Sequence, residues 1–138
     1  MDLRLRARES EGIELVEVAG ELELHNAPQL RAELLRACEG QSPCVVVDLS
    51  GLTFIDSTGI GVLVGALKRA RERGGALTLV CPVPRIRRIF EITGLLRALP
   101  LFETRAEAQA ACASTPKAAS APVTEAPVVE TSVAVEES

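Results

Sequence analysis

The sequence predicts an α/β domain in which helices pack over a mixed β-sheet. Two segments of alternating polar and apolar residues come first, and apolar runs then alternate with segments of helical periodicity. Strands separated by helices of this length need parallel crossovers, whereas the two opening strands are close enough to form an antiparallel hairpin. A chain of 138 residues, 47% of them hydrophobic, suffices for one domain with one core.

The opening hairpin is predicted from residues 3–8 and 13–18. Leucine and alanine alternate with arginine in the first run, and the second run alternates around Val16 and Val18. The Ser-Glu-Gly sequence at 10–12 between the runs favours a tight turn.

The first helix is predicted to follow this hairpin. Asn26 can cap it, Pro28 suits its first turn, and the helix is expected to end near Gly40. Its apolar face consists of Leu30, Leu34, Ala37 and Cys38.

The centre of the chain predicts a buried strand followed by a second helix. The run from Cys44 to Leu49 is apolar except for Asp48, which is typical of a strand covered on both faces, and residues 50–56 are expected to form a loop. A helix then begins at Ser57 and stops at Gly74. Its apolar positions are Ile60, Leu63, Val64 and Leu67, and its basic positions near the end are Lys68, Arg69, Arg71 and Arg73.

Three further elements complete the predicted domain. Residues 76–81 form a strand, Pro84 opens a third helix that stops before Gly94, and residues 96–102 supply a short final strand. The third helix turns Ile86, Ile89 and Phe90 inward, and its arginines Arg85, Arg87 and Arg88 are expected on a solvated face. Thr104 and Glu107 form a capping box before a last, alanine-rich helix.

The domain is expected to span residues 1–112, followed by a disordered tail over 113–138. The tail combines spaced prolines with small and acidic residues, and such a composition cannot bury enough surface to offset the entropy of ordering. It contains one short strand-like stretch, VVETSVAV.

Composition and charge exclude several functions. The net charge of −4 gives no basic surplus for direct nucleic-acid binding, and the longest apolar window, residues 59–67, is too short to span a membrane. With no secretory signal at its start, the chain is expected in the cytoplasm.

The four cysteines lie in apolar patterns without metal-binding spacing, so free buried thiols are expected, with no metal and no cofactor. Only one histidine, His25, is present, and it is read as a turn residue, which leaves an enzyme without an evident base.

The candidate site is the Asp-Ser-Thr-Gly turn at residues 56–59, where a buried strand meets a helix. Amide groups and the helix dipole favour anionic groups there. In one interpretation Asp56, Ser57 or Thr58 simply caps the helix, a role that contributes about 1 kcal/mol. In the other, Ser57 is phosphorylated, and the added charge, together with that of Asp56 and Asp48, repels a binding partner.

A nucleotide-binding sensor or enzyme is a third and weaker interpretation. Gly59 and Gly61 form a G-x-G after a strand, but neither a third glycine at dinucleotide-binding spacing nor a GK[ST] sequence follows. The glycines are better explained by a helix that starts close to neighbouring backbone and leaves room for a docking partner.

Three blocks of the chain, in order and with the right spacing, resemble the STAS domain family, and specifically its anti-sigma factor antagonists. They are GELELHNAPQL, VVVDLSGLTFIDSTGIGVLV and VPRIRRIFEITGLLRALPLF, and the central block is highly specific. The resemblance covers residues 1–112 and implies a mixed four- to five-stranded sheet with about four helices packed mainly on one side.

The resemblance also implies a partner switch. The unmodified protein would bind an anti-sigma factor that is also a serine kinase, phosphorylation of Ser57 would release that factor, and a serine phosphatase would restore the serine. The motif aspartate falls on Asp56 and the strand-end aspartate on Asp48. Glu23 stands where the family commonly has aspartate, and its longer reach bears on the geometry beside the acceptor serine.

Together these arguments predict a partner-binding surface and leave one alternative open. The predicted surface comprises Glu23, Asp48, Ser50, Asp56, Ser57, Thr58, Gly59 and Val62. In the alternative, Ser57 is only a cap, and the protein is a constitutive scaffold or adaptor that assembles with other STAS proteins. The helix face expected to be exposed for this assembly includes Val62, Ala66 and Arg69.

Overall fold

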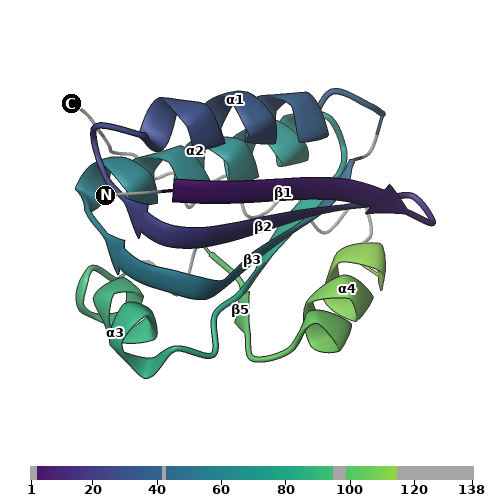
Figure 1. Ribbon diagram of the computed structural model, residues 1–138. Coiled ribbons are helices and arrows are strands. Elements are labelled where there is room, and N and C mark those ends of the chain that lie inside the picture. Colours follow the sequence, from purple (N-terminus) through teal and green to yellow (C-terminus); the bar gives the residue numbers. More distant parts are fainter. Residues whose placement is uncertain (1–2, 42, 95–98, 115–138) are drawn as a thin grey trace.

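A computed structural model describes residues 3–41, 43–94 and 99–114 and contains one mixed five-stranded sheet (Figure 1). The strands lie in the order β1-β2-β3-β4-β5, which is also their order along the chain. Their bounds are Leu3–Ser10 for β1, Ile13–Leu22 for β2, Cys44–Ile55 for β3, Ala76–Val80 for β4 and Leu101–Phe102 for β5.

Only the first pair of strands is antiparallel, and the other three pairs are parallel. In the hairpin Ser10 pairs with Ile13, and the turn between them contains Glu11 and Gly12 with positive φ angles of 54° and 83°. The predicted hairpin, the parallel crossovers and the mixed α/β sheet are therefore confirmed.

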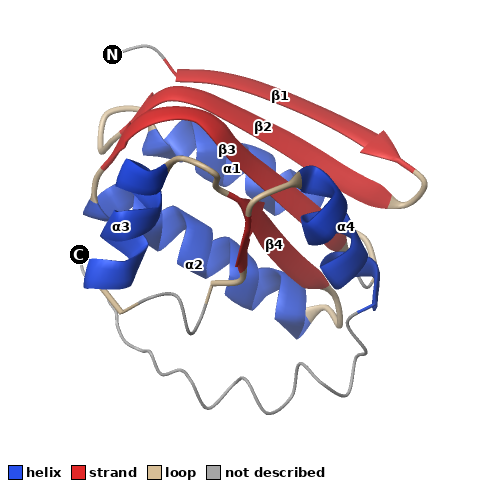
Figure 2. Cartoon of the chain, turned by 90° about the horizontal axis from the view of Figure 1, so that it is seen from below, coloured by secondary structure: helices blue, strands red, loops and turns tan. Residues whose placement is uncertain are grey.

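Four helices cover the sheet unevenly (Figures 1 and 2). They are α1 (Ala27–Ala37), α2 (Ser57–Glu72), α3 (Pro84–Ile92) and α4 (Arg105–Ser114). Helices α1 and α2 lie side by side on one face, and α3 stands at the carboxyl end of β3 and β4. Helix α4 packs on the opposite face, against β3, β4 and β5.

The core is divided by the sheet into a large and a small cluster. The large cluster unites buried residues of α1, α2 and α3, such as Leu34, Leu63 and Phe90, with the strand residues that face them. The small cluster lies under α4 and consists of Leu15, Val46, Val80, Ala108 and Cys112. Three of the four helices thus share one core, which confirms the prediction of helices mainly on one side.

The predicted loop over residues 50–56 is wrong, because β3 continues as a strand to Ile55. After Asp48, β3 is no longer paired with β4 but stays paired with β2. The register of this second half with β2 has two irregularities, and Gly51, Leu52 and Phe54 lie in the irregular part. Bulged pairing of this kind breaks the alternation of polar and apolar residues, so the segment resembles a loop in sequence.

Most predicted helix boundaries are confirmed, and two capping details differ. Gly74 and Gly94 have positive φ angles of 79° and 76° just beyond α2 and α3, as expected for helix ends. Asn26 stands at the start of α1 but makes no capping hydrogen bond with its side chain. Thr104 caps α4 by accepting from the Glu107 amide, whereas the Glu107 carboxylate accepts from Glu103 rather than Thr104.

The remaining sequence predictions meet the structure only in part. All four cysteines are free thiols, with Cys44 half-buried and the other three buried. The final strand is limited to Leu101–Phe102, and residues 95–98 of the predicted segment lie outside the described residues, as does the tail from 115 onward. No helix within the described ranges is long and apolar enough to cross a membrane.

Candidate functional site

The junction between β3 and α2 is organised by Asp56, which is the N-cap of α2. One oxygen of its carboxylate accepts a hydrogen bond from the Gly59 amide at 3.0 Å, and the other accepts from the Leu24 amide at 2.9 Å. The Asp56 amide itself donates to the Leu22 carbonyl at 3.1 Å. Asp56 therefore fills the capping role that Ser57 or Thr58 could also have filled, and it ties the loop after β2 to the start of α2.

That loop connects β2 to α1 and contains Glu23, Leu24 and His25. The Asn26 side chain holds it by accepting from the Glu23 amide and donating to the Glu21 carbonyl, both at 2.9 Å. Because the side-chain amide of Asn26 is engaged by Glu21 and Glu23, it does not cap α1. The backbone contact from Leu24 to Asp56 places the loop, and with it the half-buried Glu23, at the same end of the sheet as Ser57.

Gly59 allows the start of α2 to lie directly against the end of β2. A Cβ atom at this position would lie 2.7 Å from Leu22 Cγ and 3.0 Å from Ile55 Cγ1, which is too close for any larger residue without movement. The prediction that a glycine lets the helix approach its neighbours is confirmed for Gly59. A Cβ atom at Gly61 would have no neighbouring atom within 4 Å, so this glycine contributes an open surface instead.

Ser57 is the first residue of α2, and its side chain is exposed. Thr58 is half-buried. The first amides of a helix have no carbonyl partner within it, and among the described residues no acceptor pairs with the Ser57 or Thr58 amide. These two donors and the helix dipole favour an anionic group at Ser57.

The exposed face of α2 behind Ser57 is flat. Positions 57, 61 and 65 follow one another at intervals of one helical turn, and all three are exposed, the latter two being glycines. Val62 beside this strip is half-buried and Arg69 is exposed. Ala66, expected on an exposed face, is 4% exposed and belongs to the core, so that part of the scaffold prediction is wrong.

Two exposed apolar side chains flank the junction and were not found from the sequence. Leu24 is 71% exposed in the β2–α1 loop, and Phe54 is 47% exposed two residues before Asp56. Leu24 continues the alternation of Leu22 in sequence, but β2 ends at Leu22 and Leu24 lies in the loop, while Phe54 lies in the irregularly paired part of β3. Large apolar side chains that remain in water next to a functional residue are typical of a protein-binding surface.

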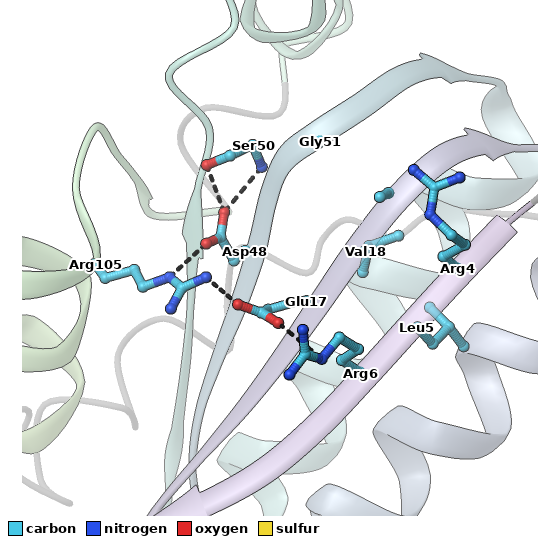
Figure 3. Close-up of a pocket in the computed structure, with 10 residues that line it drawn as sticks. Arg4, Leu5, Arg6, Glu17, Val18, Asp48, Ser50, Gly51 and Arg105 are labelled. Atoms are coloured by element: carbon cyan, nitrogen blue, oxygen red, sulfur yellow. Dashed lines mark hydrogen bonds and ion pairs between the residues drawn. The ribbon is translucent and has the colours of Figure 1, made fainter.

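Asp48 and Ser50 lie apart from this junction, in a hydrogen-bonded cluster on the α4 face of the sheet (Figure 3). The Arg105 guanidinium donates to Asp48 at 2.6 Å and also pairs with Glu17. The second Asp48 oxygen accepts from the Ser50 hydroxyl at 2.6 Å and from its amide at 2.9 Å.

This geometry corrects the prediction that Asp48 adds negative charge beside Ser57. The charge of the Asp48 carboxylate is neutralised by Arg105. Asp48 also precedes Asp56 by eight positions, a separation of roughly 25 Å along an extended strand. Burial acts to raise the pKa of Asp48, but hydrogen bonds from Ser50 and Arg105 outweigh it and hold that pKa below its ordinary value. The structure therefore does not bring Asp48 or Ser50 together with the other predicted site residues.

The described residues offer little for catalysis. His25 is exposed in its turn, as predicted, and forms no hydrogen bond to Ser57 within the part of the chain that the structure describes. No three His, Cys, Asp or Glu side chains among those residues are grouped so that they could hold a metal ion. What the junction offers is an exposed hydroxyl at a helix N-terminus, a flat helix face and two apolar side chains.

Replacing Asp56 by alanine is expected to lower the free energy of unfolding by about 1.5 kcal/mol. The substitution removes the acceptor of both the Gly59 and the Leu24 amides. Urea unfolding followed by circular dichroism measures the loss. Asp56→Asn is the matched control, since it keeps one acceptor oxygen for Gly59 and should lose less than half as much. Unchanged stability of Asp56→Ala would contradict the capping role.

The structure is thus a small α/β domain that presents an exposed serine at the start of a helix. The chain belongs to the STAS domain family, whose sequence model matches residues 4–108. This match confirms the resemblance seen in the three sequence blocks and agrees with the five-stranded mixed sheet described above.

Several relatives of this chain are anti-sigma factor antagonists. The anti-sigma-B factor antagonist of Bacillus subtilis is 36% identical over 95 residues, which are 69% of this chain and 86% of that protein. The crystal structure of an anti-sigma factor antagonist from Mycobacterium paratuberculosis matches 82% of this chain and 96% of its own, with a TM-score of 0.73 and 26% identity. The phosphorylated form of the Bacillus cell fate determinant SpoIIAA matches 78% of this chain and 96% of its own, with a TM-score of 0.58 and 25% identity.

Proposed function

We propose that this protein is an anti-sigma factor antagonist controlled by phosphorylation of Ser57. The unmodified protein binds an anti-sigma factor that is also a serine kinase. The phosphorylated protein releases that partner. Sigma-dependent transcription is thus regulated by whether the Ser57 hydroxyl is phosphorylated. The observation that carries the proposal is the exposed Ser57 at the first position of α2, within a chain whose relatives are named for this role.

The surface around Ser57 supports a contact that a charge would break. The serine follows Asp56, whose carboxylate holds the amide of the exposed Leu24, and it begins the strip formed with Gly61 and Gly65. A partner that packs on this surface removes water from it. A phosphate carrying about −1.5 to −2 charges would have to be desolvated in that contact, next to the Asp56 carboxylate.

The fold itself tolerates the modification. The free amides of Ser57 and Thr58 and the positive end of the α2 dipole can stabilise a phosphate at this position. Asp56 already has both oxygens engaged by Gly59 and Leu24, so the cap does not have to rearrange. Phosphorylation is therefore expected to change the surface rather than the fold, as a reversible switch requires. That a relative has been solved in a phosphorylated form agrees with this expectation.

This role assigns the chain no enzymatic activity, no cofactor and no direct contact with nucleic acid, and it places the protein in the cytoplasm. Its partners would be the kinase and a serine phosphatase that regenerates Ser57. Glu23, Thr58 and Val62 belong to the same surface in this proposal, whereas the buried Gly59 supports it from beneath by letting α2 pack against β2.

Phosphate mapping tests the proposal directly. The protein is incubated with ATP and the anti-sigma factor kinase of the same organism, and the modified residue is identified by mass spectrometry. One phosphate on Ser57 is expected, with none on the Ser57→Ala variant. Ser50→Ala is the matched control and should be phosphorylated like the wild type. Binding of the kinase without any phosphate on Ser57 would overturn the switch.

A further inference from the structure

β1 has a free edge. It is the first strand in the order β1-β2-β3-β4-β5, so only one of its sides pairs with another described strand. In an antiparallel pair every second residue directs its amide and carbonyl away from the partner strand. Such an edge is a template for one more strand, and proteins commonly cover it or charge it.

The two faces of β1 differ sharply in character. Leu3 and Leu5 pack against the large core cluster, whereas Arg4, Arg6 and Arg8 alternate with them and lie on the face shared with α4. Figure 3 shows Arg4 and Arg6 beside the Asp48 cluster, where they line a hollow of about 540 Å³. The edge strand is therefore apolar on one face and basic on the other.

The basic face is only partly neutralised. Arg6, whose side chain is 79% exposed, reaches Glu17 at 3.7 Å, but Glu17 is also paired with Arg105. Within residues 3–41, 43–94 and 99–114, Arg4 and Arg8 form no ion pair. A segment with negative charge at alternate positions would complement this strand.

The described part of the chain ends at the end of the sheet where the β1–β2 turn lies, although α4 itself packs on β3, β4 and β5. In α4 the Cys112 thiol donates to the carbonyls of Val45 and Ala76, the opening residues of β3 and β4, so α4 ends above the starts of these strands. The β1–β2 turn lies at this end too, because Ile13 pairs with both Ser10 and Cys44. From β3 the edge strand is two strand spacings away, which is about 10 Å.

The sequence that follows α4 is acidic and contains one stretch of alternating apolar residues. Residues 115–138 contain four glutamates and one lysine, and the stretch 128–137 reads VVETSVAVEE. In an extended segment Val133 and Val135 would share one face, and Glu130 and Glu136 would lie at the two ends of the other face, with Ser132 and Ala134 between them. Residues 115–127, when extended, reach up to about 40 Å, far more than the distance to β1.

We propose that the acidic segment 128–137 binds along the free edge of β1 of the same molecule as an added, antiparallel strand. Because the chain leaves α4 at the end of the sheet where β1 ends, a segment returning along β1 runs antiparallel to it. In one such register Val133 lies opposite Leu5, Val135 opposite Leu3 and Glu130 opposite Arg8, while the uncharged Ser132 and Ala134 lie opposite Arg6 and Arg4. Glu136 is then the diagonal neighbour of Arg4, within reach of its side chain.

Such a strand would close the β1 edge of the sheet by pairing backbone with backbone, and its charges would select it over other chains. Domains of this family do not require it, since the match to the family ends at residue 108. The inference is independent of the phosphorylation switch and concerns a different part of the molecule.

Hydrogen exchange of the β1 amides, followed by NMR on the full chain, tests the proposal. The amides of β1 that point away from β2 are expected to exchange at least tenfold more slowly than unprotected amides. The double variant Glu130→Lys/Glu136→Lys should bring them to within about threefold of the unprotected rate. Glu72→Lys/Glu125→Lys, with the same change in net charge, is the matched control and should keep the protection.

Two results would overturn the proposal. In the first, the outward amides of the wild type exchange at the unprotected rate, and the edge is then empty. In the second, their protection survives the Glu130→Lys/Glu136→Lys change and falls on dilution, which would show that a second copy of the chain occupies the edge.

Discussion

A Ser57→Asp substitution is expected to weaken binding of the anti-sigma factor kinase by at least about 100-fold, or about 2.7 kcal/mol. The aspartate places a permanent negative charge at the start of α2, at one end of the flat helix face and next to Asp56, which holds the loop of the exposed Leu24. Ser57→Ala removes only a hydroxyl and should bind within about threefold of the wild type. Isothermal titration calorimetry with the purified partner measures both affinities.

A matched control separates a local effect from a general effect of charge. Ser10→Asp introduces the same charge at an exposed position beside the β1–β2 turn, and it should leave the affinity unchanged. Equal affinities of Ser57→Asp and Ser57→Ala would contradict a charge mechanism. They would favour the scaffold interpretation, in which Ser57 has no regulatory role.

An Arg105→Ala substitution is expected to lower the free energy of unfolding by about 2 kcal/mol and the midpoint of thermal unfolding by roughly 10 °C. The Asp48 side chain is 6% exposed, and Arg105 is the cation that compensates its charge. Removing a partner leaves a buried carboxylate unpaired, and the partial exposure of Arg105 moderates the loss. Urea and thermal unfolding measure the effect.

The double variant Asp48→Asn/Arg105→Ala is the control, because the neutral amide no longer requires a cation. It should recover about half of the lost stability, whereas simple additivity of the two substitutions would contradict a specific ion pair.

The pH dependence gives a second readout of the same pair. The pKa of Asp48 is depressed in the folded protein, so its stabilisation is present above the ordinary carboxyl pKa and is lost as the pH falls through the folded value. Arg105→Ala should move acid unfolding to higher pH.

Local sequence was sufficient for most elements of the fold. Alternation in residues 3–8 and 13–18 predicted the hairpin, helical periodicity after Ser57 predicted α2, and Gly74 and Gly94 marked helix ends. Each of these signals is contained within a few neighbouring residues, because backbone conformation and side-chain periodicity are local properties. The same holds for the placement of Ser57 at the head of a helix.

The prediction failed where a residue's role depends on distant partners. Residues 50–55 read as a loop because bulged pairing with β2 interrupts their alternation. Asp48 was grouped with Asp56 because both are acidic and close in sequence, whereas its partner Arg105 lies 57 positions away.

Ser57 shows both contributions. The sequence by itself determined the family, the strand-to-helix junction and the serine at its start. Tertiary structure alone decided that Asp56 is the cap, since its second oxygen is held by the Leu24 amide from another part of the chain. It also decided that Leu24 and Phe54 remain exposed, one in the loop that Asp56 holds and the other near the end of β3. The physical reason is that exposure and charge pairing depend on which elements meet in space, whereas helices, strands and turns depend chiefly on neighbours in the chain.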